Sequence, residues 1–468
     1  MPQMITNPAT LAPLGDVPES GIDDIERAVA AAVAAAPSWL AMPAAQRAAL
    51  LQEIGSRIRG SERELAELST RESGLARCEA LDCVRAAAAS FDFFAAHTGS
   101  RAGLSESGSG SSGVLAVLAP FNLALPVMAA CVGRALAAGL SVVYKPPAQD
   151  PLTSLQLARA FDVLPTGVAN VVTGGAKVGR ALVTHPGIGR VMFTGSMAAG
   201  LEIAAAAEGK HLDLEVGTVD AHIVCRGADL DLAVPAIAWT RLRSGGQAWM
   251  SGGHVYVERS LAAEFVDRMH PCVGFLDVDD PSKPSTDLGP LISLEAARKV
   301  EDQVGRTLRA GAKLILGGRR FRPSGLPGHF FQPTILTDVK PGSVPMREEI
   351  PGPVITVTPV ADLAEALRFW TEFTVRPAIS PSGASIYADD AGTAARAVEA
   401  IAEGFFRIND PAVSGLGPFS GLRHRGIRLA LGADPHDASD RRAKHVESSP
   451  AIERKPWWFP YIDRARSP

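Results

Sequence analysis

A regular alternation of short apolar strands with helices between residues 113 and 217 constrains the fold of this 468-residue chain more than any other feature. The strand-like runs are VLAVLAP (114–120), SVVYKPP (141–147), NVVTG (170–174), RVMFTGS (190–196) and LDLEVG (212–217). A helical pattern separates each run from the next. Short buried strands that alternate with helices form βαβ units and a parallel sheet. The alternation therefore predicts an α/β nucleotide-binding architecture.

The regions on either side extend this prediction to nearly the whole chain. Four helices are predicted before the alternation, over about 22–40, 43–59, 62–73 and 75–97. Ser20 or Asp23 is expected to cap the first of them. Residues 6–17 carry Pro and Asn and are predicted to form a loop. A second α/β region follows Glu215 to about residue 430, and the Gly/Ser-rich tract 105–113 is predicted to be flexible.

Composition and charge exclude several classes of function. A net charge of −4 gives no electrostatic reason to expect nucleic acid or an anionic membrane as a partner. The five cysteines form no CxxC pair and no His/Cys ligand spacing, which predicts a reducing cytoplasm and no structural zinc. The uncharged stretch 114–133 is long enough for a membrane span, but Pro120, Asn122 and Pro126 interrupt it. A strand, a loop and a buried helix are predicted there instead, and no signal peptide is recognised.

Several motifs occur in the order and at about the spacing found in one known superfamily. They are NPAT (7–10), APFNLALP (119–126), VVYKPP (142–147), FTGSMAAG (193–200), LDLEVG (212–217), EEIPGP (348–353) and GPFSGLRHRGI (417–427). Through them the chain resembles the aldehyde dehydrogenase superfamily over nearly its whole length. The resemblance implies two Rossmann-like α/β domains with a reduced oligomerisation element. It predicts a nucleotide-binding domain over 1–97 and 113–217, a catalytic-type domain over 218–430, and oligomerisation or tail segments over 98–112 and 431–468.

The resemblance also implies a set of cofactor contacts. Lys145 matches the lysine that holds the adenosine ribose. Gly195 and Ser196 match a glycine turn and helix start that bind the pyrophosphate, and Gly174 ends another strand that faces the same cofactor. Glu349 matches the glutamate that binds the nicotinamide ribose. These residues predict NAD or NADP as the cofactor.

Three positions near these contacts depart from the family pattern. Ala148 replaces a glutamate that contacts the ribose 2′-hydroxyl, and this loss admits NADP because an acid there would repel a 2′-phosphate. Thr218 replaces a glycine beside the nicotinamide, and Pro351 replaces a phenylalanine that packs near the ring. These three losses favour a structural pseudoenzyme without cofactor.

The residues matching the family's catalytic positions are Asn122, Glu215 and Trp249. Asn122 matches an asparagine that stabilises the oxyanion, and Glu215 matches the general base. The family keeps its nucleophilic cysteine 34 residues after that base, and here 249 − 215 = 34 identifies the position as Trp249. An indole carries only an N–H donor and cannot attack a carbonyl group. The sequence therefore predicts that the thiol needed for covalent aldehyde oxidation is absent.

No other residue is predicted to replace the thiol. Ser244 and Ser251 lie in the same loop, but neither has a basic partner visible in the sequence. His211 and His254 are predicted to be ordinary strand or loop histidines. Cys225 lies in the apolar run AHIVCRG and is predicted to pack in the core.

Three functions remain open on the sequence. The first is a family member that binds NAD(P) and serves as a partner or ligand-binding subunit without covalent turnover. The second is an oxidoreductase in which Glu215 deprotonates an alcohol or aldehyde hydrate without a covalent step. The third is a structural pseudoenzyme without cofactor. The expected ligand is a small aldehyde, an alcohol or a related molecule, a homodimer is one expected assembly, and the aromatic segment 455–461 is expected to pack over the body or a neighbouring subunit.

Overall fold

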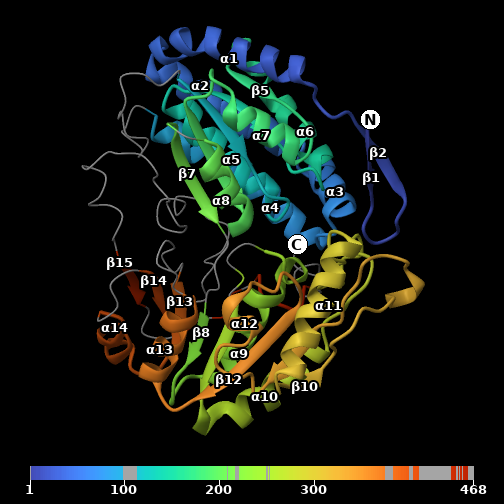
Figure 1. Cartoon of the computed structure of the whole chain (residues 1–468), viewed down its shortest axis with the longest axis vertical. Coiled ribbons are helices and arrows are strands. Elements are labelled where there is room, and N and C mark those ends of the chain that lie inside the picture. The colour runs from blue at the N-terminus through green and yellow to red at the C-terminus, as the bar shows by residue number, and fades with distance from the viewer. Residues whose placement is uncertain are drawn as a thin grey trace.

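A computed structural model of the chain describes residues 2–98, 113–207, 209–216, 221–248, 251, 253–374, 383–399, 404–409, 444–448, 452, 454–455 and 457–461. These residues form two α/β units, each built around its own sheet, and a small hairpin beside them (Figure 1). Among the described residues, none of the helices combines the length and the apolar character that crossing a membrane requires.

The first unit contains a five-stranded parallel sheet in the order β5-β4-β3-β6-β7. Its strands are β3 (Val114–Leu118), β4 (Ser141–Lys145), β5 (Ala169–Val171), β6 (Arg190–Gly195) and β7 (His211–Val216). Every residue of β3 and β4 is buried, as in a sheet that helices cover on both faces. The predicted parallel sheet is thus confirmed. The strand order reverses between β3 and β6, which opens a crevice beyond their carboxyl ends.

Eight α-helices surround this sheet. They are α1 (Ile22–Ala41), α2 (Ala44–Gly60), α3 (Glu62–Ser73), α4 (Arg77–Ala96), α5 (Ala124–Ala137), α6 (Pro151–Ala158), α7 (Ala176–Thr184) and α8 (Met197–Ala206), with the 3-10 helix η1 (Arg159–Val163) after α6. The four helices predicted before the sheet are all present. The predicted cap of α1 is wrong: the cap is Gly21, whose N–H donates to the Asp24 carboxylate at 2.8 Å. The Ser20 hydroxyl is already occupied, because it accepts the N–H of Thr173 at 3.0 Å.

The amino-terminal hairpin corrects a second prediction. Strands β1 (Gln3–Thr6) and β2 (Pro13–Val17) pair antiparallel, so residues 13–17 do not form the predicted loop. The side-chain oxygen of Asn7 accepts the N–H groups of Ala9 and Thr10 at 2.8 and 3.1 Å, which turns the chain back. Proline is tolerated at the first position of a strand, which is where Pro13 lies.

The second unit contains an eight-stranded sheet in the order β10-β11-β12-β9-β8-β13-β14-β15, in which β10 alone of these strands runs antiparallel to its neighbour. The strands are β8 (Ala221–Val224), β9 (His254–Glu258), β10 (Lys313–Leu316), β11 (Thr334–Thr337), β12 (Val354–Val360), β13 (Gly383–Tyr387), β14 (Gly404–Ile408) and β15 (Lys444–Ser448). The helices are α9 (Leu230–Leu242), α10 (Arg259–Gly274), α11 (Leu294–Arg309), α12 (Val344–Arg347), α13 (Leu363–Thr374) and α14 (Ala391–Glu399), with the 3-10 helices η2 (Arg243–Gly246) and η3 (Pro323–Gly325). The second α/β region predicted after Glu215 is therefore present.

The predicted domain limits stay predictions. Residues 99–112, 217–220 and 410–443 lie outside the described residues, and they include most of the proposed oligomerisation segment and the motif at 417–427.

Candidate functional site

One pocket of about 630 Å³ lies where the two units meet, and residues of both units line it. The first unit contributes the segments that follow the carboxyl ends of β3, β4, β5 and β6. The second unit contributes Gln247, Lys299, Glu349 and Pro351. A crevice beyond the carboxyl ends of parallel strands, at the point where the strand order reverses, is the usual ligand site of such sheets. We call this cavity the junction pocket.

The structure brings most of the predicted contact residues to the junction pocket. Asn122, Lys145, Gly195, Ser196 and Glu349 all line it. Gly174 lies directly before the lining residue Gly175. Lys145 ends β4, and Gly195 ends β6.

Lys145 is a buried cation whose hydrogen bonds are all to neutral acceptors. Its ammonium group donates to the carbonyl oxygens of Pro146 at 2.7 Å and of Gly174 at 3.0 Å. No carboxylate lies within ion-pair distance of it among the described residues. Burial lowers the pKa of Lys145 to about 8. An ammonium group has three N–H donors, so one remains for a ligand in the pocket.

Two glycine turns lead into helices on the same wall. Ser196 is the cap of α8, and its hydroxyl accepts the N–H of Ala199 at 3.3 Å. A helix start presents unsatisfied N–H groups and a positive dipole end to an anion. Gly174 has a φ of 142°, and a Cβ placed on Gly175 would meet no atom within 4 Å. The backbone before α7 is therefore open to close approach by a ligand.

The junction pocket also contains two basic side chains that no sequence motif identified. Lys177 and Arg180 lie one turn apart on α7 and line the junction pocket with Ala148. Glu202 on α8 is an acidic lining residue of the first unit. Lys177 lies three residues after Gly174, and Arg180 lies three residues after Lys177. This spacing places both side chains on one face of a helix that begins after the Gly174 turn, so the sequence could have identified them.

Asn122 joins the two units across the pocket. Its side-chain N–H donates to the carbonyl oxygen of Gln247 at 2.8 Å. Leu123, the next residue, has a φ of 59° and precedes α5. The second N–H of the Asn122 amide remains available to an oxygen atom in the pocket.

Glu349 belongs to the opposite wall. Glu349 is an exposed residue that lines the pocket, and desolvation by the protein atoms around its carboxyl group raises the pKa of that group. The charges of Arg241 and Lys299 oppose that shift. Lys299 on α11 also lines the pocket, and no sequence motif identified it.

The turn that precedes position 249 has an unusual backbone. Ser244, Gly245 and Gly246 have φ values of 55°, 65° and 71°, all in the left-handed region. Only glycine adopts that region without strain, so Ser244 costs free energy that its surroundings must offset. Gln247 follows the turn: its side chain donates to the Ser244 carbonyl at 3.1 Å and accepts the Ile292 N–H at 3.0 Å.

Of the three predicted catalytic positions, the structure describes Asn122 fully, the backbone of Glu215 and nothing of Trp249. Trp249 lies outside the described residues, as does Thr218. The backbone of Glu215 lies in β7 opposite Thr194 of β6, but its side chain is not among those described. The roles of Asn122, Glu215 and Trp249 therefore stay predictions.

The other nucleophile candidates occupy structural positions. His254 is buried between the hydroxyl groups of Thr356 and Thr358, at 2.7 and 2.8 Å from its two ring nitrogens. Burial raises the pKa of the Cys225 thiol to about 12, so it is a core residue as predicted. The Ser251 hydroxyl lies 3.5 Å from a guanidinium nitrogen of Arg241, a donor group that cannot take a proton from it.

No group of three or more His, Cys, Asp or Glu residues is placed to hold a metal ion within the described part of the chain.

Comparison with known proteins agrees with this architecture. The family model of the aldehyde dehydrogenase family matches residues 2–437. The chain is 32% identical over 441 residues to the succinate-semialdehyde dehydrogenase (NADP(+)) of Escherichia coli, an alignment that covers 90% of this chain and 89% of the relative. It is 34% identical over 425 residues to the 3,6-anhydro-alpha-L-galactose dehydrogenase of Streptomyces coelicolor, covering 86% and 84%.

Solved structures show the same relationship. A glyceraldehyde-3-phosphate dehydrogenase of Methanocaldococcus jannaschii complexed with NADP superposes with a TM-score of 0.80 at 27% identity, covering 88% of this chain and 91% of that one. The two sheets, the junction pocket between them and a family match over residues 2–437 lead to one conclusion. The chain belongs to the aldehyde dehydrogenase family.

Proposed function

We propose that the chain binds NADP(H) in the junction pocket and lacks the thiol on which covalent aldehyde oxidation depends. The observation that carries the proposal is the residue 34 positions after Glu215, which is Trp249 and not cysteine. An indole cannot form the hemithioacetal from which hydride would pass to a nicotinamide. The chain would then act as a ligand-binding member of its family, with a small aldehyde, an alcohol or a related molecule beside the cofactor.

The junction pocket fits a dinucleotide in size and in chemistry. Its volume of about 630 Å³ is within the ~300–1,000 Å³ range of small-molecule and cofactor sites. Lys145 would bind the adenosine ribose through its remaining N–H, the start of α8 at Ser196 would bind the pyrophosphate, and Glu349 would bind the nicotinamide ribose. When bound, the nicotinamide supplies the hydride acceptor. The residues of this chain bind and orient it.

The same pocket favours NADP over NAD. Ala148 carries no charge, while Lys177 and Arg180 bring two cations to the lining of the same pocket. A 2′-phosphate carries about two negative charges, and basic side chains bind it where an acid would repel it. Two similar proteins are also associated with NADP: the succinate-semialdehyde dehydrogenase of Escherichia coli by its name, and the Methanocaldococcus jannaschii enzyme by its complex.

Titration of the full chain with NADP+ and with NAD+ tests cofactor binding. We expect NADP+ to bind more tightly by about tenfold, which corresponds to about 1.4 kcal/mol. Ala148→Glu should reverse this order, because it restores a carboxylate beside the 2′-position. Ala34→Glu adds the same charge at an exposed position on α1 and should leave both affinities unchanged. The absence of any binding by either nucleotide would overturn the proposal in favour of a structural protein without cofactor.

The missing thiol is tested by restoring it. Wild-type protein should show no NADP+-dependent oxidation of succinate semialdehyde or glutarate semialdehyde, the aldehydes named for relatives. Trp249→Cys should create such activity, and Trp249→Ala should not, because it opens the same space without supplying sulfur. Steady oxidation by the wild-type protein would contradict the proposal.

A non-covalent oxidoreductase is the second candidate, and the intact Asn122 on the pocket wall favours it. In that case wild-type turnover would be abolished by Glu215→Gln, since the base would be lost while size is kept.

A further inference from the structure

The aromatic segment Trp457–Tyr461 packs next to the turn that leads into the junction pocket, although more than 200 residues separate them in sequence. Trp458, Phe459 and Tyr461 are only 2%, 6% and 1% exposed and share a core with Trp239 of α9. The tail therefore packs against the body of the chain, one of its two predicted placements. It also lies beyond residue 437, where the family match ends.

Tyr461 is held at both its side chain and its backbone. Its hydroxyl group donates to the Glu79 carboxylate at 2.7 Å and accepts the indole N–H of Trp239 at 3.2 Å. Its backbone N–H donates to the carboxylate of Asp287 at 2.6 Å. A buried tyrosine with three directed hydrogen bonds has one defined position.

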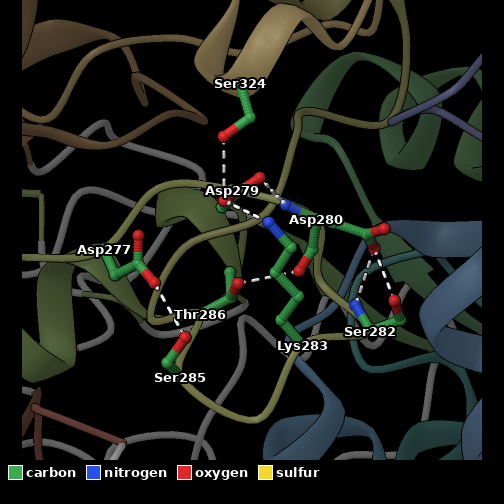
Figure 2. Close-up of polar contacts among 8 residues, drawn as sticks. All are labelled: Asp277, Asp279, Asp280, Ser282, Lys283, Ser285, Thr286 and Ser324. Carbon is green, nitrogen blue, oxygen red and sulfur yellow. Dashed lines mark hydrogen bonds and ion pairs between the residues drawn. The ribbon is translucent and has the colours of Figure 1, made fainter.

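The loop that receives the backbone of Tyr461 is itself held by many polar contacts. Figure 2 shows those contacts, which join Ser285 to Asp277, Lys283 and Ser324 to Asp279, and Ser282 to Asp280. Asp287 accepts the N–H of Asp277 at 3.0 Å, and the Pro281 carbonyl accepts the N–H of Arg77 at the start of α4. The loop thus ties the tail to the helix that carries Glu79.

Glu79 connects the tail to the pocket. The same carboxylate oxygen that binds Tyr461 accepts the backbone N–H of Ser244 at 2.8 Å. Ser244 is the residue whose left-handed backbone begins the turn, and Gln247 at the end of the turn lines the pocket. The carbonyl of Gln247 in turn accepts the hydrogen bond from Asn122.

We propose that Tyr461 and Glu79 are positioning residues for the turn at Ser244–Gln247. The hydroxyl group of Tyr461 orients the Glu79 carboxylate, and the carboxylate holds the Ser244 amide against the strain of its backbone. Gln247 is thereby kept where it closes the wall of the pocket. The proposed effect on the turn does not depend on whether the chain binds a nucleotide. An effect on nucleotide affinity rests on the proposed function.

The pKa of the Glu79 carboxyl group provides a way to detect its hydrogen bond with Tyr461. Burial raises the pKa of Glu79 to about 7, and the Tyr461 hydroxyl, the Ser244 N–H and the charge of Arg243 oppose the shift. The ionisable groups that face it are Asp82 and Cys83 on α4, Arg243 on η2 and Tyr461 on the tail. Because the hydroxyl group stabilises the ionised carboxylate, its removal should raise the pKa further.

Hydrogen exchange of the full-length protein tests the proposal without any ligand. In Tyr461→Phe, exchange at the amides of Ser244–Gln247 should become about tenfold faster, while exchange in α10 stays unchanged. Protection of these amides against exchange, after correction for the intrinsic pH dependence of exchange, should change with a midpoint near pH 7 in the wild type. The midpoint should shift upward in Tyr461→Phe. Glu79→Gln should abolish this midpoint.

Tyr387→Phe is the matched control. It removes another buried tyrosine hydroxyl in the second unit, one that lies 3.3 Å from a ring nitrogen of His222 on β8. It should leave exchange of the turn unchanged. Equal acceleration in both tyrosine variants, or unchanged exchange of the turn in Tyr461→Phe, would overturn the proposal. If Tyr461→Phe does not fold, the midpoint measured in the wild type and lost in Glu79→Gln decides the question.

NADP+ affinity separates the two proposals. Tyr461→Phe should weaken binding about threefold to tenfold, and Tyr387→Phe should not. If the wild-type protein binds no nucleotide, the proposed function fails while the exchange result still decides the role of Tyr461.

Discussion

The two units each bury a cation beside the junction pocket, but they use it differently. Lys145 of the first unit is 8% exposed, lines the pocket and has two carbonyl partners. Arg241 of the second unit is 2% exposed and donates to the carbonyl oxygens of Gly246 at 3.2 Å and Ile350 at 2.7 Å. Burial lowers the pKa of Lys145 to about 8 and that of Arg241 to about 10, and Glu349 opposes the second shift.

The difference follows from the chemistry of the two side chains. An ammonium group is a compact charge with rotatable donors, so Lys145 can hold the backbone and still contact a ligand. A guanidinium group spreads its donors over a rigid plane, so Arg241 can bridge two backbone segments behind the pocket. The first unit thus places a buried charge on the lining of the junction pocket, whereas the second unit places one against its own backbone.

The largest effect on stability is expected from adding a methyl group to the turn that Arg241 contacts. Gly246→Ala should lower the free energy of unfolding by about 3 kcal/mol or more, because φ is 71° and the new Cβ would overlap the carbonyl of Gly352. Gly175→Ala, on the wall that Lys145 belongs to, should change it by less than about 0.5 kcal/mol, since the new Cβ meets open space. Chemical unfolding of both variants is the measurement, and similar losses would show that the two walls are equally constrained.

Removing each cation should affect different properties of the chain. Arg241→Met leaves the carbonyl groups of Gly246 and Ile350 without this donor and should lower the free energy of unfolding by about 3 kcal/mol. Lys145→Met also leaves two carbonyl groups without a donor, but this side chain lines the pocket, where water can replace it, so the change should cost about 1 kcal/mol or less while weakening NADP+ binding by about tenfold. Thermal unfolding paired with nucleotide titration distinguishes the two. Equal losses of stability in both variants would remove the contrast.

Two buried carboxyl groups predict how stability depends on pH. Glu72 accepts hydrogen bonds from the N–H groups of Leu152 and Thr153 within the first unit. Glu79 lies beside the turn that leads into the junction pocket. Burial raises the pKa of each carboxyl group from 4.5 to about 7. Between pH 4.5 and 7 the folded chain keeps protons that the unfolded chain releases. The free energy of unfolding should therefore fall as pH rises through this window, by up to about 1.4 kcal/mol per unit for each group.

Urea unfolding at pH 5, 6 and 7 measures that slope. Glu72→Gln and Glu79→Gln should each reduce it, and the double variant should reduce it further. A slope that is unchanged in both single variants would assign the pH dependence to other groups.

The smallest effect on stability is expected from removing the hydrogen bond that Asn122 donates to Gln247 across the junction pocket. Asn122→Ala should lower the free energy of unfolding by about 1 kcal/mol, because the carbonyl of Gln247 loses its donor. The same change combined with Gly246→Ala should cost less than the sum of the two, since the second variant already displaces the turn. Strict additivity would mean that Asn122 and the turn are independent.

The sequence could predict those features of the fold that a local sequence pattern determines. Strands that alternate with helices allowed the parallel sheet to be predicted. Lys145, Gly195 and Ser196 were selected through their match to the motifs of the family, and the structure places them at the end of β4, at the end of β6 and at the cap of α8. The hairpin at residues 3–17 was missed because its Pro and Asn residues suggested a loop throughout. In the structure Asn7 lies in the turn between the strands, and Pro13 is tolerated at the first position of β2.

Contacts between distant segments could not be predicted in this way. Glu79 and Tyr461 are 382 positions apart, and no periodicity relates them. Arg241 reads as an ordinary helix residue until the fold places Gly246 and Ile350 against it. Lys177 and Arg180 are the exception, since their spacing after the Gly174 turn was visible in the sequence.

The left-handed backbone of Ser244 bears on how this loop can be engineered. Asparagine adopts a φ near 55° more readily than serine does. Ser244→Asn would therefore relieve strain, so the turn that precedes position 249 can be made more stable before the chemistry at that position is changed.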